Sequence, residues 1–127
     1  MNGENEQLTG TWYGHLPADS ARHIWFRILP DGRHIGFPPK NSAPPFTYGC
    51  ARFRLTPVSP GVLHGRFRAG DAGWLTVYHF EGEKLFLLPK TAADRGHPYF
   101  ECRRVTPEEL PEWFEERFAQ ALAKEWL

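Results

Sequence analysis

Short turn signals separate alternating runs of residues along most of this 127-residue chain. They read Pro-Asp-Gly at 30–32, Ser-Pro-Gly at 59–61, Gly-Asp-Ala-Gly at 70–73 and Glu-Gly-Glu-Lys at 81–84. Proline fixes φ in a turn and glycine accepts a positive φ, so each signal predicts a tight connection between two strands. Eight strands follow from this spacing, at 9–16, 22–29, 33–37, 50–56, 62–69, 74–80, 85–88 and 99–105.

Strands joined by tight turns, with no helix between them, pair antiparallel with their sequence neighbours. We therefore predict a mainly β fold, an antiparallel up-and-down meander of about eight strands that closes as a barrel. The chain is expected to form a single domain, 1–127, with its strands at about 9–105. The one long connection, 38–48, contains four prolines and is either a stiff spacer or a binding loop.

The pattern changes after Val105, where one C-terminal amphipathic helix is expected at about 111–126. Proline is disfavoured inside a helix but welcome at its start, so a short turn should come first and Pro111 should begin the helix. Apolar residues then recur at steps of three and four, at Trp113, Phe114, Phe118, Ala121, Leu122 and Trp126. This apolar side either docks on the sheet or associates with another chain.

Alternation assigns the strand residues to two faces of the sheet. The face expected to line the interior holds Phe26, Ile28, Ile35, Phe37, Phe53, Leu55, Phe67, Trp74, Tyr78, Phe80, Leu85 and Leu87. The other face mixes basic and apolar residues, namely Arg27, Arg52, Arg54, Arg66, Arg68, His79, Leu75, Val77, Phe86 and Leu88. The turn spacing places Arg54 opposite Arg66, and Arg66 near Val77.

Arginines grouped on one sheet face repel one another unless something compensates their charge. Residues 1–105 carry 13 Lys and Arg against 9 Asp and Glu, whereas residues 106–127 carry 2 against 6. Three interpretations follow. The face is solvated, or the acidic helix lies over it with its apolar side on Leu75, Val77 and their neighbours, or an anionic ligand or acidic protein binds it.

The segment 8–14, Leu-Thr-Gly-Thr-Trp-Tyr-Gly, resembles the Gly-x-Trp first strand of lipocalin-like (calycin) barrels, of which the short bacterial domains are the nearer comparison. In that family the tryptophan closes one end of an up-and-down barrel, and an arginine from a late strand packs across it. The resemblance implies that Trp12 is structural and that Arg103 or Arg104 covers it. It also implies a small apolar or amphiphilic ligand inside the barrel, and it carries over no catalytic residue.

Other features argue against several classes of function. The net charge is zero, so nothing favours nucleic acid as the main partner. No run approaches the roughly 18 apolar residues of a membrane helix, and residues 1–7 are polar, so a cytoplasmic protein is expected.

Motifs for phosphate, zinc or a catalytic nucleophile are absent, and the six histidines are scattered. We therefore predict no metal, cofactor or catalytic residue, and an enzyme would need a converging pair such as His79 with Glu101.

The leading hypothesis is a lipocalin-like protein that binds a small hydrophobic or amphiphilic ligand in the barrel interior. The predicted ligand-binding residues are Phe53, Phe67, Trp74, Tyr78, Arg54 and Arg66. The alternative is a protein-interaction module or homodimer that uses the arginine-rich face and the C-terminal helix. A calycin-like enzyme or a haem binder is a minor alternative.

Overall fold

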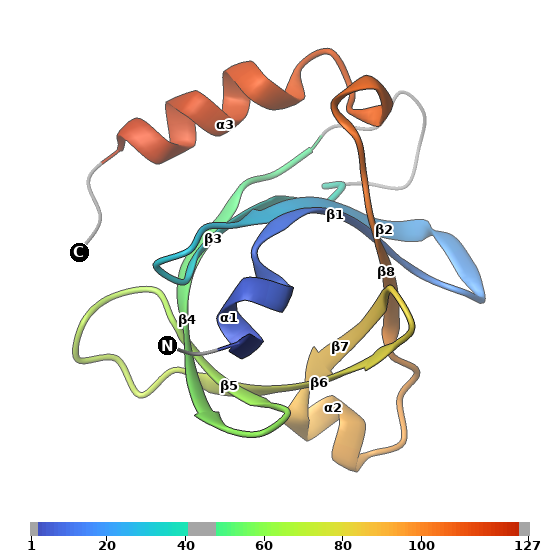
Figure 1. Cartoon of the computed structure of the whole chain (residues 1–127), viewed down its shortest axis with the longest axis vertical. Helices are drawn as coiled ribbons and strands as arrows, with labels where there is room; N and C mark the ends of the chain where they lie inside the picture. Colours follow the sequence, from blue (N-terminus) through green and yellow to red (C-terminus); the bar gives the residue numbers. More distant parts are fainter. Residues whose placement is uncertain (1–2, 41–47, 125–127) are drawn as a thin grey trace.

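The structure, a computed structural model, describes residues 3–40 and 48–124, and its eight strands form a closed barrel (Figure 1). Each strand pairs antiparallel with its sequence neighbours, and β1 also pairs with β8, which closes the sheet. The strands are β1 (Gly10–Leu16), β2 (Asp19–Ile28), β3 (Arg33–Phe37), β4 (Ala51–Ser59), β5 (Val62–Arg66), β6 (Trp74–Glu81), β7 (Lys84–Pro89) and β8 (Phe100–Arg104). The other elements are α1 (Gly3–Leu8), α2 (Lys90–Asp94), the 3-10 turn η1 (Pro107–Glu109) and α3 (Phe114–Ala123). The predicted fold class is confirmed.

The connections of an up-and-down barrel alternate between its two ends. The tight turns after β2, β4 and β6 lie at one end, which we call the closed end. The connections after β1, β5 and β7 lie at the other end, which we call the mouth. Helix α1 lies across the barrel in the view of Figure 1, and its last residue, Leu8, is buried in the interior.

Trp12 anchors the closed end and is fully buried. Its indole Nε1 donates a hydrogen bond to the carbonyl oxygen of Leu8 over 2.9 Å, which ties α1 to β1. The guanidinium of Arg104 lies 4.3 Å from the centre of the Trp12 ring and donates to the carbonyl oxygens of Gln7 and Thr9. The same cation thus covers the tryptophan and satisfies carbonyl groups at the end of α1.

Of the two arginines expected to cover Trp12, the structure selects Arg104. Arg103 is the next residue back along β8 and therefore points to the opposite face of the sheet. There it lies 5.5 Å from the Tyr13 ring and forms an ion pair with Glu109 of η1 over 2.5 Å.

The register of the sheet confirms one prediction and corrects another. Arg54 lies opposite Arg66, as the turn spacing predicts. Val77, however, pairs with Val62 rather than lying near Arg66. The reason is that β5 ends at Arg66 and a seven-residue connection, 67–73, replaces the short turn that the sequence suggested. Phe67, expected inside the barrel, therefore lies at the mouth with 60% of its surface exposed.

Ile35 and Phe37 were also expected inside, and this prediction is wrong. The inward positions of β3 are His34 and Gly36, which pair with Ile28 and Phe26. The apolar residues of β3 instead form a cluster between the barrel wall and α3, which we call the outer cluster. Its buried members are Ile35, Phe37, Phe114, Phe118 and Ala121.

Helix α3 docks on the sheet, which is one of the two expected arrangements, but it is shorter than expected and does not lie at Leu75 and Val77. The predicted short turn is present as η1, but the helix begins at Phe114 because 111–114 forms a tight turn closed by a bond from the Phe114 amide to the Pro111 carbonyl. Trp126 falls outside the described residues. The helix packs on β2 and β3, not on Leu75 and Val77 of β6 (Figure 1).

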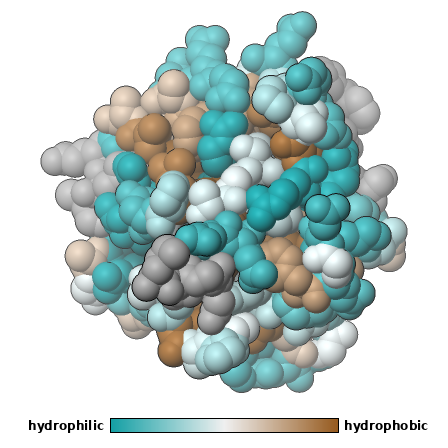
Figure 2. Space-filling view, viewed as in Figure 1, coloured by the Kyte–Doolittle hydropathy of each residue, from teal (hydrophilic) through white to brown (hydrophobic). Residues whose placement is uncertain are grey.

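Neither α1 nor α2 was predicted. Each is a single short segment of five or six residues, too short to be stable alone, so its helical form depends on contacts with the barrel. Figure 2 shows hydrophobic and hydrophilic residues interspersed over the face seen in this view.

Candidate functional site

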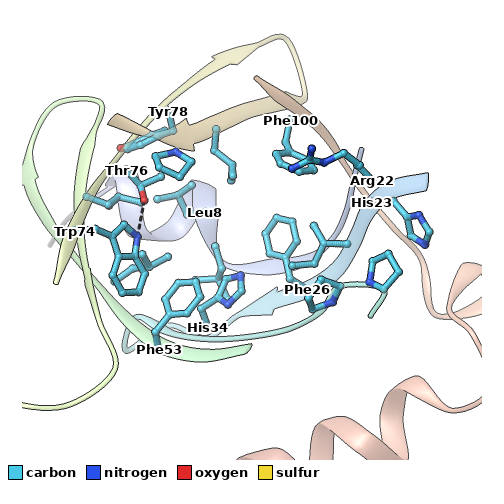
Figure 3. Close-up of a pocket in the computed structure, with 18 of the residues that line it drawn as sticks. Leu8, Arg22, His23, Phe26, His34, Phe53, Trp74, Thr76, Tyr78 and Phe100 are labelled. Carbon is cyan, nitrogen blue, oxygen red and sulfur yellow. Dashed lines mark hydrogen bonds between the residues drawn. The ribbon is translucent and has the colours of Figure 1, made fainter. Parts of the chain in front are cut away.

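The barrel encloses a cavity of about 540 Å³, which extends from Leu8 at the closed end to residues at the mouth. Most of its lining is apolar (Figure 3). The lining residues are Leu8, Ala21, Arg22, His23, Ile24, Phe26, Ile28, His34, Pro38, Pro39, Phe53, Leu55, Leu63, Trp74, Thr76, Tyr78, Leu87, Pro89 and Phe100.

Three of the four predicted aromatic binding residues line this cavity: Phe53, Trp74 and Tyr78. Phe53 and Trp74 meet edge to face with ring centres 5.0 Å apart. Phe67 does not line the cavity. It lies at the rim of the mouth and contacts Trp74, with the two ring centres 5.0 Å apart. Glycine at 65 makes room for this arrangement, since a Cβ there would lie 2.6 Å from the Trp74 ring.

The two predicted binding arginines, Arg54 and Arg66, are not part of the lining. They point outward from β4 and β5, because the inward positions of these strands hold Phe53, Leu55 and Leu63. Arg54 lies opposite Arg66 on one side and opposite another arginine, at position 33, on the other.

The sequence reasoning missed the polar groups inside the cavity. His34 on β3 is 7% exposed, and its ring stacks on Phe53 with centres 4.1 Å apart and on Phe26 with centres 5.2 Å apart. Burial lowers the pKa of His34 from 6.5 to about 3, so the imidazole is neutral at pH 7. Alternation within β3 carries the signal that could have found it, since His34 and Gly36 alternate with two apolar residues.

Two more polar residues are buried in the lining. Thr76 accepts a hydrogen bond from the Trp74 indole Nε1 over 3.1 Å (Figure 3). His23 lies apart from these groups at one edge of the view, and its Nε2 is 2.9 Å from the hydroxyl of Tyr48.

Outside the barrel, α3 supplies part of the charge compensation expected for the arginines. Glu115 accepts two hydrogen bonds from Arg27, over 3.0 and 2.9 Å, and the Arg27 guanidinium lies 4.4 Å from the Phe118 ring centre. Arg52 donates to the backbone carbonyl of Lys124 just after the helix. The apolar side of α3 is therefore packed on the barrel of its own chain.

The pair named for acid–base chemistry does not converge on the cavity. His79 is exposed and lies 3.2 Å from Glu81, while Glu101 forms an ion pair with Lys84 over 3.1 Å. Within residues 3–40 and 48–124, no three His, Cys, Asp or Glu side chains gather as a metal site would require.

Comparison with known proteins gives no family. No protein-family model matches the chain, and no curated protein is significantly similar to it. None of the helices in the described part of the chain has the length and apolar character to cross a membrane.

Proposed function

We propose that this protein is a lipocalin-like binding protein that holds a small, mainly apolar molecule inside its barrel. The observation that carries the proposal is the cavity of about 540 Å³. Ligand pockets commonly measure about 300–1,000 Å³ and are lined mostly by apolar and aromatic side chains with a few polar groups. The cavity has this size and this lining.

The closed end supports the lipocalin-like part of the proposal. Trp12 on the first strand, covered by Arg104 from the last strand, is the arrangement that the resemblance of segment 8–14 implies. The same closure makes the cavity a pocket that is blocked at one end, which suits retention of a ligand.

A fluorescence titration with N-phenyl-1-naphthylamine, an apolar dye that brightens when it leaves water, tests the proposal. We expect saturable binding at one site per chain. The matched variants are Leu87→Trp and Phe86→Trp, which place the same large side chain on the two faces of β7. Leu87 lines the cavity and Phe86 does not, so only Leu87→Trp should abolish binding.

Circular dichroism would first establish that both variants are folded. The proposal fails if the wild-type chain does not bind the dye, or if a folded Leu87→Trp variant binds it as well as the wild type does. The interaction-module alternative stays a prediction, and the packing of α3 on its own barrel leaves the arginine row of Arg33, Arg54 and Arg66 as the surface on which it would depend.

A further inference from the structure

His34 is a polar side chain near the closed end of an otherwise mainly apolar cavity. It is the second residue of β3, which starts at the closed end, and Figure 3 shows its ring directed into the cavity beside Phe53. It is 93% buried, since only 7% of its surface is exposed. Among the residues that the structure describes, its Nδ1 atom has no hydrogen-bond partner and is itself fully buried, so Nε2 is the ring nitrogen left to face the cavity. A buried polar group of this kind is unusual, because most such groups are satisfied.

The ring is held in a defined orientation although Nδ1 has no partner. It is stacked between Phe26 and Phe53, with interplanar angles of 23° and 13°. The absence of a side chain at Gly36 also matters, because a Cβ there would lie 2.8 Å from Cε1 of the imidazole. The ring is thus positioned before any ligand arrives, which lowers the entropy lost on binding.

Thr76 offers a second polar group in the same cavity. Its hydroxyl oxygen already accepts the Trp74 indole N–H, which fixes the position of the oxygen. A hydroxyl that accepts one hydrogen bond still has its own proton to donate. The cavity therefore contains both a neutral imidazole and a hydroxyl, on β3 and on β6, within an apolar wall.

The charges around the cavity restrict the ligand further. Of the described lining residues, Arg22 alone carries a formal charge, and it lies near the start of β2, at the mouth. Within the described lining, no Lys or Arg lies beside His34 to compensate a carboxylate, and burying an uncompensated charge is strongly unfavourable. The deep end of the cavity therefore suits a neutral hydrogen-bonding group and not an anion.

We infer that His34 is the polar anchor of the cavity and that its ligand is an apolar, uncharged molecule bearing a hydroxyl group, bound with the hydroxyl inward. This inference rests on the proposed function and adds the chemical class of the ligand. The apolar body would contact the aromatic side chains nearer the mouth, and the hydroxyl would pair with the imidazole.

Three probes of one shape test the inference: naphthalene, 2-naphthol and 2-naphthoate, each measured by displacement of N-phenyl-1-naphthylamine. The wild-type chain should bind 2-naphthol about tenfold more tightly than naphthalene, the gain expected of one hydrogen bond in a dry site. It should bind 2-naphthoate no better than naphthalene. His34→Phe keeps a flat ring between Phe26 and Phe53 and should reduce the affinity for 2-naphthol to that for naphthalene.

The control is His79→Phe, which changes an exposed histidine outside the barrel and should leave all three affinities unchanged. A measurement without a variant is the ¹⁵N spectrum of the His34 ring, which should shift on addition of 2-naphthol and not of naphthalene. This keeps the test decisive even if His34→Phe fails to fold.

The outcomes separate the two proposals. If none of the apolar probes binds, the proposed function fails, and the inference fails with it. If naphthalene and 2-naphthol bind equally well to the wild type, or if 2-naphthoate binds best, the ligand-binding function stands and the role of His34 is wrong. A folded His34→Phe variant that still prefers 2-naphthol would overturn the inference in the same way.

Discussion

The barrel wall has an apolar cluster on each side, and the two differ in how they are filled. The outer cluster lies between β3 and α3 and is packed with aromatic rings. The ring centres of Phe37 and Phe114, for example, are 5.4 Å apart. The interior also contains many aromatic rings, but they line a cavity of about 540 Å³. Similar side chains thus form a packed cluster on the outside of the wall, where α3 covers them, and line a cavity on the inside.

The contrast teaches that aromatic content alone does not locate a binding site. In the outer cluster, arginines lie over the aromatic rings, as Arg27 does over Phe118 and Arg117 does over Phe37. In the interior, the rings border the cavity, and its lining carries polar atoms such as those of His34. The filled cluster should contribute mainly to stability and the hollow one mainly to binding.

The largest expected effect comes from removing one ring on each side. Phe114→Ala should lower the free energy of unfolding by about 3–5 kcal/mol, because the ring is fully buried and leaves a void. Phe53→Ala should lower it by only about 1–2 kcal/mol, because the ring already borders empty space. Urea unfolding measures the free energy of unfolding of both variants. Equal losses in the two variants would contradict the distinction between a packed outer cluster and an interior that lines a cavity.

The pH dependence of the free energy of unfolding tests whether His34 is buried in a dry cavity. The folded pKa of His34 is lowered to about 3 against an ordinary value of 6.5, so between these values the unfolded chain binds a proton that the folded chain excludes. The free energy of unfolding should therefore fall as the pH drops below 6.5, with a slope that approaches about 1.4 kcal/mol per pH unit.

The control for this titration is His34→Phe, which shares every other titrating group. Urea unfolding from pH 7 to pH 4.5 measures the free energy of unfolding of both proteins. The difference between them should change with pH, with a slope that approaches about 1.4 kcal/mol per pH unit. A constant difference would mean that water reaches the imidazole and that the cavity is not dry around it.

The smallest effect on the free energy of unfolding is expected from the ion pair between Arg27 and Glu115, at the edge of the outer cluster. Hydrogen bonds from Arg27 lower the pKa of Glu115, so the ion pair stabilises the fold near pH 7 and is lost as the pH falls through the lowered value. Glu115→Gln should cost less than about 1 kcal/mol at pH 7, because the Glu115 side chain is 62% exposed. Its unfolding curve should merge with that of the wild type under acidic conditions, while Glu116→Gln serves as the exposed control.

The number and order of the strands could be predicted from the sequence, and so could the burial of Trp12 beneath an arginine at the closed end. Turn residues specify their own backbone conformation locally, so the eight runs and the pairing of Arg54 with Arg66 could be predicted. The resemblance of one short segment implied that Arg103 or Arg104 covers Trp12, and the structure selects Arg104.

The faces of β3 could not be predicted in the same way. Alternation identifies an inner face only when the outer face is polar, and here α3 covers the outside with its own apolar side. Ile35 and Phe37 were therefore assigned to the interior, and His34 was overlooked. The predicted binding residues Phe53, Trp74 and Tyr78 were assigned to the interior face, and all three line the cavity.

The closed end also has a kinetic consequence. With Trp12, Arg104 and α1 blocking that end, a molecule has to leave through the opening by which it entered. Two molecules cannot pass one another in such a pocket, so an occupant has to depart before a successor enters. The rate of exchange is then set by the departure of the first molecule, whatever the concentration of the second.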